Sequence, residues 1–357
     1  MSDILVIGGG IAGLSAAARL APHAKITVLE AEDALAYHAS GRSAALYAAD
    51  YGAPSVVELS QASGAFYLEG DRRYCSPRGV LFLASAEERA AFEHDCAEMA
   101  LDEITMDEAS ALVPILNRDK VAFAGLSHAP QDIDTDLLVQ DFTRIIRANG
   151  GAIHLKTKVS TITRDARWRV TAGDQVYEAE TLIDAAGPWA DTIAQMAGVA
   201  PIGLQPMRRS MARIPAPGGH DLSSWPMFFG TGGQWYAKPD AGQLIVSPSE
   251  EHPMEPHDAW ADDMVIAEGL ARYEEMVTEP VTRLTANWAG LRTFAPDRTL
   301  VLGPAPQDAG FIWCAGQGGY GFQTAPAASQ LVADLTLGRA PALDPALVAA
   351  LSPRRFA

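Results

Sequence analysis

The sequence predicts an α/β fold in which a Rossmann-like, doubly wound domain is interleaved with a second, α+β domain built on an antiparallel or mixed sheet. Short apolar runs that end in glycine-rich turns occur near both ends and in the middle of the chain, as in a parallel sheet. Segments of alternating polarity separate them and indicate antiparallel strands. The length of 357 residues suggests about two domains and a sizeable buried core.

The first elements form a strand, a turn, a helix and a second strand. Residues 4–7 (ILVI) are a continuous apolar run, typical of a strand buried on both faces. A glycine-rich turn follows at 8–13, an alanine-rich helix at 14–20 and a second strand at 25–29. These elements lie within about 30 residues, which is the length of a βαβ unit.

The next segments are helical. Residues 84–116 are rich in charge at helical spacing and predict two surface helices. Acidic residues at 131–136 precede an apolar run, which predicts a helix start with carboxylates at its positive end. The alternate carboxylates also resemble a calcium loop. Leu137 stands where such a loop needs glycine, so helix capping is the better interpretation.

The remaining elements include both strand types. Residues 181–187 predict a buried strand ending in a glycine turn, with a helix at 190–197 behind it. Alternating polarity then predicts antiparallel strands at 207–214, 234–238, 243–248 and 282–293. Near the carboxyl end, a buried strand at 311–315 leads into a second glycine-rich turn at 316–321 and an alanine-rich helix.

This order cuts one domain into pieces, because the antiparallel segments stand between the glycine-turned parallel elements. We expect a discontinuous parallel-sheet domain made of residues 1–75, 140–203 and 293–357. A second domain would comprise residues 76–139 and 204–292.

Composition excludes several classes of function. Lysine and arginine total 27 against 44 acidic residues, a net charge of −17, which disfavours nucleic acid and anionic membranes as partners. The three cysteines, Cys75, Cys96 and Cys314, give neither a disulfide framework nor paired metal-ligand spacing, which predicts a reducing cytoplasm. The most apolar window, residues 4–20, contains glycines and Arg19, so we expect no membrane span and no secretory signal.

The first glycine-rich turn has the spacing of a dinucleotide-binding site. Gly8 permits a tight turn, Gly10 lets the backbone approach a pyrophosphate, and Gly13 lets helix pack on strand. The helix start offers unpaired N–H groups to the anion. Glu30 ends the next strand, where a carboxylate accepts hydrogen bonds from ribose hydroxyls and disfavours a 2′-phosphate.

The second glycine-rich turn favours FAD over NAD. A hydride-shuttling NAD enzyme needs only one nucleotide unit, whereas this chain brings a second strand-to-helix turn at its far end. A helix amino terminus at the pyrimidine edge of a flavin stabilises the negative charge that develops there on reduction. We therefore expect FAD as the cofactor.

Five motifs in order resemble the FAD-dependent D-amino-acid oxidase family, and among its members the bacterial D-arginine dehydrogenase branch. They are GGGIAG at 8–13 with Glu30, GRSAA at 41–45, DAAGPW at 184–189, WAGLR at 288–292 and QGGYGFQ at 317–323. The resemblance runs nearly end to end. It implies hydride transfer from the substrate Cα to flavin N5, followed by hydrolysis of the imino acid to a 2-oxo acid and ammonia.

The resemblance also implies the residues that hold FAD. They lie in the glycine turns and the segments after the strands: Gly8, Gly10, Ile11, Ala12, Gly13, Glu30, Ala31, Gly41, Arg42, Ser43, Ala44, Ala45, Leu46, Val159, Ala186, Gly187, Trp189, Gly316, Gly318, Gly319, Tyr320, Gly321, Phe322 and Gln323. No cysteine falls at residues 288–294, where sarcosine oxidases attach their flavin, so we expect non-covalent FAD.

Two arginines match the positions that bind the substrate carboxylate in the resembling enzymes, Arg209 and Arg292. Arginine suits this task because its guanidinium is permanently charged and offers two parallel donors. Arg208 and Arg209 are neighbours in a predicted strand and face opposite sides, so only one of them enters a pocket. Without the resemblance, a surface salt bridge would be the better interpretation of either arginine.

Two tyrosines and the second turn complete the implied substrate site. Tyr51 and Tyr236 match tyrosines that close around the substrate, and with Arg209 and Arg292 they are the predicted catalytic set. Core or rim packing is the alternative role for a tyrosine. The Gly319 carbonyl would accept from the substrate amino group, with Gln323 beside it.

Two departures from the branch predict a different side-chain preference. Leu46 stands where the enzyme for basic substrates has a histidine, and Gly79 stands near the place of its guanidinium-binding acid. Burying a cation without a carboxylate partner is costly, so we expect a preference for neutral or apolar amino acids.

Other interpretations remain open. The acidic segment 251–258 contains two histidines, yet a solvated loop is the better interpretation than a metal site, and we predict no metal. The fold also supports oxidation of N-methyl amino acids or other secondary amines, and a nucleotide-binding redox sensor is the non-enzyme alternative. The sequence does not choose between oxygen and a quinone as electron acceptor, and it leaves the oligomeric state open.

Overall fold

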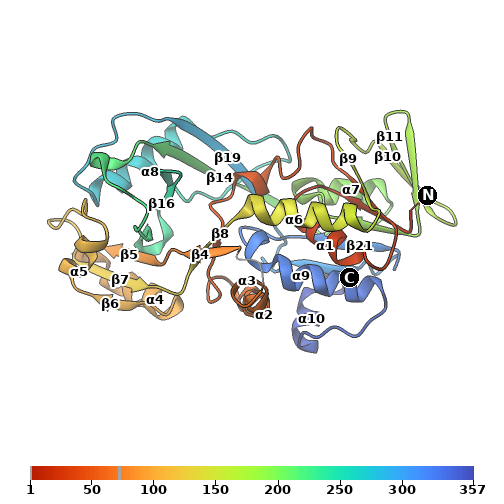
Figure 1. Cartoon of the computed structure of the whole chain (residues 1–357), viewed down its shortest axis with the longest axis horizontal. Coiled ribbons are helices and arrows are strands. Elements are labelled where there is room, and N and C mark those ends of the chain that lie inside the picture. Colours follow the sequence, from red (N-terminus) through yellow and green to blue (C-terminus); the bar gives the residue numbers. More distant parts are fainter. Residues whose placement is uncertain (1, 71–73) are drawn as a thin grey trace.

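The computed structural model describes residues 2–70 and 74–357 of the chain. Its elements form two sheet-based halves placed end to end along the long axis (Figure 1). Both termini lie in the half that contains α1, α9 and β21, whereas β5, β7 and β16 lie in the other half (Figure 1).

A six-stranded sheet forms the half that holds both termini. Its order is β20 (Val301–Pro304), β21 (Phe311–Ala315), β13 (Thr181–Asp184), β1 (Ile4–Ile7), β2 (Ile26–Leu29) and β9 (Ala152–His154). All neighbours are parallel except β20 and β21. The strand β1 has β2, the next strand along the chain, on one side and the much later strand β13 on the other. The strand order therefore reverses direction at β1, which makes β1 the topological switch point of the sheet.

Both faces of this sheet are covered, and alternate residues of one strand serve the two faces. Ile4 and Val6 pack with the helices of the first face, whereas Leu5 and Ile7 pack with the second. The first face carries α1 (Ile11–Leu20), α6 (Thr135–Ala148) and α9 (Gly321–Thr336). The second carries α7 (Ala190–Met196) and the sheet of β10 (Thr161–Arg164), β11 (Trp168–Ala172) and β12 (Gln175–Ala179).

A nine-stranded mixed sheet forms the other half. Along it lie β18 (His252–Pro253), β14 (Gln205–Ile214), β17 (Gln243–Ser247), β16 (Tyr236–Asp240), β15 (Met227–Gly230), β5 (Val80–Ala84), β7 (Phe123–Ser127) and β6 (Asp102–Ile104), and β19 (Ala286–Phe294) pairs with β14. Only β15 and β5 are parallel. The helices of this half are α4 (Arg89–Glu98), α5 (Met106–Leu112) and α8 (Asp263–Glu275).

A small three-stranded sheet lies between the halves. It consists of β3 (Leu46–Tyr47), β8 (Gln131–Ile133) and β4 (Cys75–Pro77). The helices α2 (Pro54–Ala62), α3 (Gly64–Leu68) and α10 (Pro345–Leu351) complete the first half. We propose two domains with the two large sheets as their cores. The expected boundary at 139/140 falls inside α6 and the one at 292/293 falls inside β19, so these two boundaries move to the ends of those elements.

The predicted fold class is confirmed, and several local predictions need correction. Residues 84–116 hold two helices, but β6 separates them and the second ends at Leu112. The buried strand β5 and the partly buried strand β7 are absent from the sequence prediction. The helix start near residue 134 is confirmed, since the Asp134 carboxylate accepts the Leu137 N–H at 2.9 Å.

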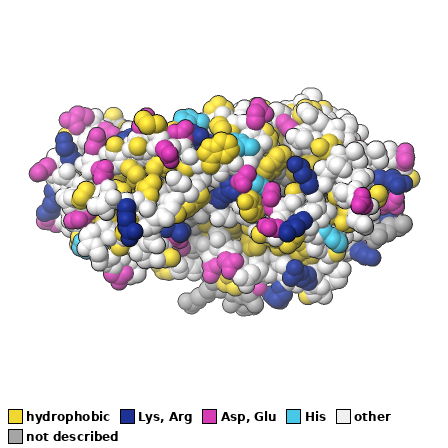
Figure 2. Space-filling view, turned by 90° about the horizontal axis from the view of Figure 1, so that it is seen from above, with side chains coloured by type: hydrophobic (Ala, Val, Ile, Leu, Met, Phe, Trp, Pro, Cys, Tyr) yellow, Lys and Arg dark blue, Asp and Glu magenta, His cyan; other side chains and the backbone are white. Residues whose placement is uncertain are grey.

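The surface carries mixed charge. Acidic and basic side chains are scattered over the face seen in Figure 2, without one dominant patch. Among the described residues, no helix is both long and apolar enough to cross a bilayer. Residues 2–70 and 74–357 also contain no group of three or more His, Cys, Asp or Glu placed to hold a metal ion.

Candidate active site

A cavity of about 460 Å³ opens at the carboxyl ends of β1, β2 and β13 and reaches across to β14 and β19. Its position at the switch point of a doubly wound sheet is where such folds bind nucleotides. Its volume lies within the ordinary range for small-molecule and cofactor sites.

The first glycine turn forms the floor of the cavity. A Cβ on Gly8 would lie 2.3 Å from the Ala185 carbonyl oxygen, and Gly8 has a φ of +110°. A Cβ on Gly13 would lie 2.0 Å from the Gly8 oxygen. No side chain at these two positions fits the turn, so the backbone of β1, α1 and β13 stays in close contact. The helix start of α1 therefore faces the cavity directly.

The Glu30 carboxylate is placed to bind a ribose. It is buried at the end of β2, where Oε2 accepts the Gly9 N–H at 2.7 Å and Oε1 accepts the Glu32 N–H at 2.8 Å. A carboxylate has about four lone-pair sites, so each oxygen keeps acceptor capacity for a hydroxyl. These residues fit the adenosine half of a dinucleotide.

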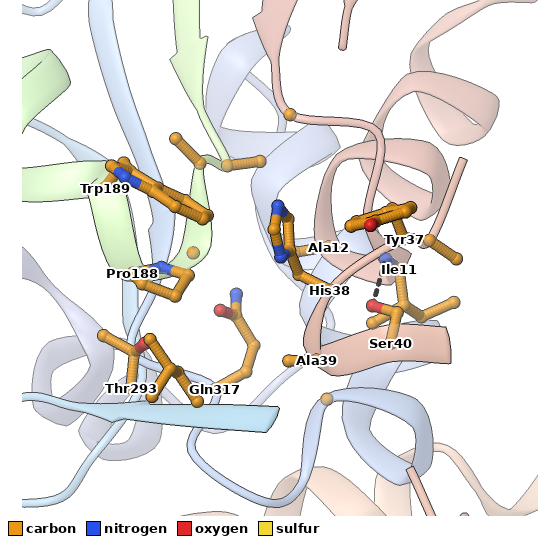
Figure 3. Close-up of a pocket in the computed structure, with 18 of the residues that line it drawn as sticks. Ile11, Ala12, Tyr37, His38, Ala39, Ser40, Pro188, Trp189, Thr293 and Gln317 are labelled. Atoms are coloured by element: carbon orange, nitrogen blue, oxygen red, sulfur yellow. Dashed lines mark hydrogen bonds between the residues drawn. The ribbon is translucent and has the colours of Figure 1, made fainter. Parts of the chain in front are cut away.

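Aromatic side chains form the wall around the nucleotide part. The His38 ring lies 4.8 Å from the Trp189 ring and 5.0 Å from the Tyr37 ring, measured between centroids. Figure 3 shows His38 between Tyr37 and Trp189, with the Ile11 N–H donating to Ser40 Oγ at 3.0 Å. His38 was not predicted as a site residue, because none of the glycine motifs includes it.

Arg42 links the aromatic wall to the half of the molecule that contains the nine-stranded sheet. Its guanidinium donates to the carbonyl oxygens of Ala259 and Ala289 at 2.9 and 2.8 Å, and it pairs with Asp258. The hydrogen bond from Arg42 lowers the pKa of Asp258. The segment 251–258 is therefore not simply a solvated loop, as the sequence suggested, because Asp258 pairs with Arg42 and Glu251 pairs with Arg209.

The second glycine turn approaches the opposite side of the cavity. A Cβ on Gly318 would lie 2.2 Å from Phe294, and one on Gly319 would lie 2.6 Å from Arg292 Cζ. The turn leads into α9, whose amino terminus faces the cavity through Gly321 and Phe322. Gln317, which the sequence analysis did not select, points into the cavity in Figure 3.

Arg209 and Arg292 both line the cavity. Arg208 turns away to His252, 3.2 Å from its ring nitrogen, in keeping with strand alternation. Burial lowers the pKa of Arg209, and the positive charge of Arg292 lowers it further. Two guanidiniums in a partly dry site form a strong binding site for a carboxylate.

The two predicted tyrosines lie near the arginines but outside the cavity lining. Tyr236 is buried and its hydroxyl donates to Met211 Sδ at 3.2 Å, whereas the Tyr51 side chain is exposed and its ring lies 5.6 Å from that of Tyr320. Gln323 is buried behind them, where its Nε2 donates to Ser60 Oγ at 3.0 Å and to the Tyr51 carbonyl at 3.3 Å.

The predicted cofactor residues divide into two groups. Those that line the cavity are Gly8, Gly10, Ile11, Ala12, Glu30, Ala31, Arg42, Ser43, Ala44, Val159, Ala186, Gly187, Trp189, Gly318, Gly319, Gly321 and Phe322. Those outside its lining are Gly13, Gly41, Ala45, Leu46, Gly316, Tyr320 and Gln323. Lining residues that the sequence analysis missed include Tyr37, His38, Ser40, Lys158, Pro188, Met211, Thr293 and Gln317.

A doubly wound sheet with this glycine cradle, joined to a second sheet that lines the same cavity, has the arrangement of a dinucleotide-dependent enzyme. Residues 3–335 match the family model described as FAD dependent oxidoreductase (DAO), and the chain belongs to this family. FAD is its cofactor. The buried Glu30, the two glycine turns and the start of α1 would hold it.

Relatives match the chain over different shares of its length. A glycine oxidase of Pseudomonas putida is 24% identical over 370 residues, which cover 96% of this chain and 97% of the relative. An N-methyl-L-tryptophan oxidase of Salmonella typhimurium is 25% identical over 226 residues, 59% of this chain and 58% of the relative. The structure of a Geobacillus kaustophilus glycine oxidase superposes with a TM-score of 0.82 at 21% identity and covers 98% of both chains.

Proposed function

We propose that this chain catalyses the FAD-dependent oxidative deamination of D-amino acids and prefers neutral or apolar side chains. The observation that carries this proposal is the pair Arg209 and Arg292, both on the wall of the cavity that fits the dinucleotide. A site with two guanidiniums beside a flavin suits a substrate with a carboxylate next to the carbon that is oxidised.

Each residue of the site has a task in this reaction. The two arginines bind the substrate carboxylate and orient Cα, and the Gly319 carbonyl accepts a hydrogen bond from the amine. FAD, when bound, accepts the hydride from Cα. The amine releases a proton to solvent water as the C=N bond forms, and a water molecule then adds to the imino acid and gives a 2-oxo acid and ammonia. Tyr51 and Tyr236 would close the site around the substrate.

The surroundings of Leu46 support a neutral or apolar substrate side chain. Leu46 packs in one hydrophobic cluster with Met211 and Tyr236. The acid nearest to it along the sheet, Asp132, is already paired with Lys238 at 3.0 Å and Arg78 at 2.6 Å. This group carries one net positive charge, so a cationic substrate side chain finds no free carboxylate there.

The D configuration rests on the resemblance of the five motifs to the D-arginine dehydrogenase branch. A second candidate is the oxidation of N-methyl amino acids, which the similarity to the N-methyl-L-tryptophan oxidase of Salmonella typhimurium supports. Non-covalent FAD is proposed because β19 contains no cysteine. The three free cysteines support a reducing cytoplasm as the location.

The test is anaerobic bleaching of the flavin by D-, L- and N-methyl amino acids, compared as reduction rate over dissociation constant. D-valine or D-methionine should give the highest ratio. A highest ratio for D-arginine would exclude the proposed side-chain preference, and one for N-methyl amino acids would select the second candidate. A flavin that no amine reduces would instead indicate a sensor.

A further inference from the structure

The carboxylate of Glu251 lies among three arginines at the edge of the candidate active site. Its Oε1 is 3.3 Å from Arg209 Nη2 and 3.9 Å from Arg292 Nη1, and its Oε2 is 2.8 Å from Arg298 Nη2. Glu251 comes from the segment between β17 and β18. It therefore contacts the same two guanidiniums that would bind the substrate carboxylate.

The backbone of the same segment completes this contact. Arg209 Nε donates to the carbonyl oxygen of Glu250 at 2.9 Å, so both ends of the guanidinium fork are engaged by neighbouring residues. A carboxylate at the Nη edge of a buried arginine is the contact that an amino acid substrate makes with its own carboxylate. Three guanidiniums around one carboxylate leave a net positive charge, which attracts a second anion.

We propose that Glu251 competes with the substrate carboxylate for Arg209 and Arg292 and thereby sets the affinity of the site. In the ligand-free chain its side chain satisfies the two arginines. An incoming amino acid replaces these contacts with its own carboxylate. This inference rests on the proposed function, because it assumes that the arginines bind a carboxylate.

When the substrate displaces Glu251 from Arg209 and Arg292, the Glu251 carboxylate still has Arg298 as a partner. Its shortest contact is to Arg298, which lies outside the pair and is half exposed. The Arg298 guanidinium is held 3.8 Å from the centre of the Phe294 ring, so it keeps its place. Glu251 is itself 31% exposed and turns outward at small desolvation cost. Arg298 thus retains Glu251 while the two inner arginines accept the substrate.

The substitution Glu251→Gln tests the competition in the FAD-loaded chain. Calorimetry would measure the Kd of isovalerate, a carboxylate that matches valine without its amine, and steady-state kinetics would measure the KM and kcat for D-valine. The Kd of isovalerate and the KM for D-valine should both fall about five- to tenfold, with kcat unchanged, since one competing anion is gone. Glu255→Gln, an exposed residue of the same segment, is the matched control and should change neither.

The substitution Arg298→Gln tests whether Arg298 holds Glu251 away from the two inner arginines. It also gives a second test if the Glu251 variant folds poorly. It releases Glu251 onto the inner arginines and should raise the KM for D-valine, whereas the double variant should behave like Glu251→Gln alone. An unchanged or raised KM in Glu251→Gln overturns the inference, because Glu251 would then only orient the arginines. If the unmodified protein binds no isovalerate and D-valine leaves its flavin oxidised, the proposed function fails instead.

Discussion

Arg209 and Arg292 are diagonal neighbours on one face of the sheet, because β14 and β19 pair antiparallel with Arg209 opposite Gly290 and Met207 opposite Arg292. Residues directly opposite in such a pair share a face, and so do residues two positions away. The register thus brings two like charges together on the wall of the cavity. Glycine opposite Arg209 leaves space above the strand, and Arg42 and Ala39 approach from the other half there.

Removing one guanidinium should weaken substrate binding. We expect Arg209→Gln to raise the KM for D-valine about a hundredfold, since a hydrogen bond between charged groups in a buried site contributes about 1.5–3 kcal/mol. Arg209→Lys should recover only part of this loss, because lysine has no two-donor fork. Steady-state kinetics measure the change. The control is Arg213→Gln, which removes an arginine four residues further along β14 and should leave the KM for D-valine unchanged.

Gly319 should be sensitive to a single methyl group. A Cβ there would lie 2.6 Å from Arg292 Cζ, so Gly319→Ala must displace the arginine. We expect kcat/KM for D-valine to fall about tenfold, equivalent to about 1.4 kcal/mol. In an Arg292→Lys background the same alanine should cost less, because the displaced group is already gone. Equal costs in the two backgrounds would show that Gly319 acts independently of Arg292.

Glu30 should contribute to FAD affinity. In Glu30→Gln, the amide nitrogen must face either the Gly9 or the Glu32 N–H, so one buried donor loses its acceptor. We expect the Kd of FAD to rise about tenfold, equivalent to about 1.4 kcal/mol. Titration of the apoprotein, followed by flavin fluorescence, measures it. Glu58→Gln, an exposed change on α2, should leave the Kd as it is.

The parts of the site that are local in sequence were predictable. The turn at 8–13 and Glu30 belong to one βαβ unit, and each residue there has a steric or hydrogen-bonding requirement that a short pattern expresses. The contact of Glu251 with Arg209 was not predictable, since it depends on how β14, β17 and β18 meet. His38 was missed for a similar reason, because its partner Trp189 lies in another glycine motif.

The same distinction between local and long-range contacts explains which strands were predicted from the sequence. The strands that end in a glycine turn and the alternating strands within residues 205–294 were found, with bounds that shifted by a few residues, whereas the alternating strand β11 (WRVTA) was missed. The strand β5 (VLFLA) was missed, although it is fully buried. Its place is decided by parallel pairing with β15, far away in the chain, and a short apolar run carries no period that separates strand from helix.

Asp184 should make stability depend on pH. It ends β13 beneath the cavity, fully buried, and its Oδ1 accepts the Ala186 N–H at 3.1 Å. Burial raises the pKa of this carboxyl well above its ordinary value of 3.8. The folded chain therefore holds a proton that the unfolded chain releases. The contribution to the free energy of unfolding is fully present below pH 3.8 and is lost as the pH rises through the raised, folded-state pKa.

The variant Asp184→Asn removes this proton linkage and keeps the shape of the side chain. Urea unfolding of the FAD-loaded protein at pH 5 and pH 8 measures the effect. The unmodified protein should lose more stability between these two pH values than the variant does, because only its Asp184 must stay protonated or bear a buried charge at pH 8. Equal losses in both proteins would show that Asp184 is ionised in the folded state, with a partner inside the protein that stabilises its charge.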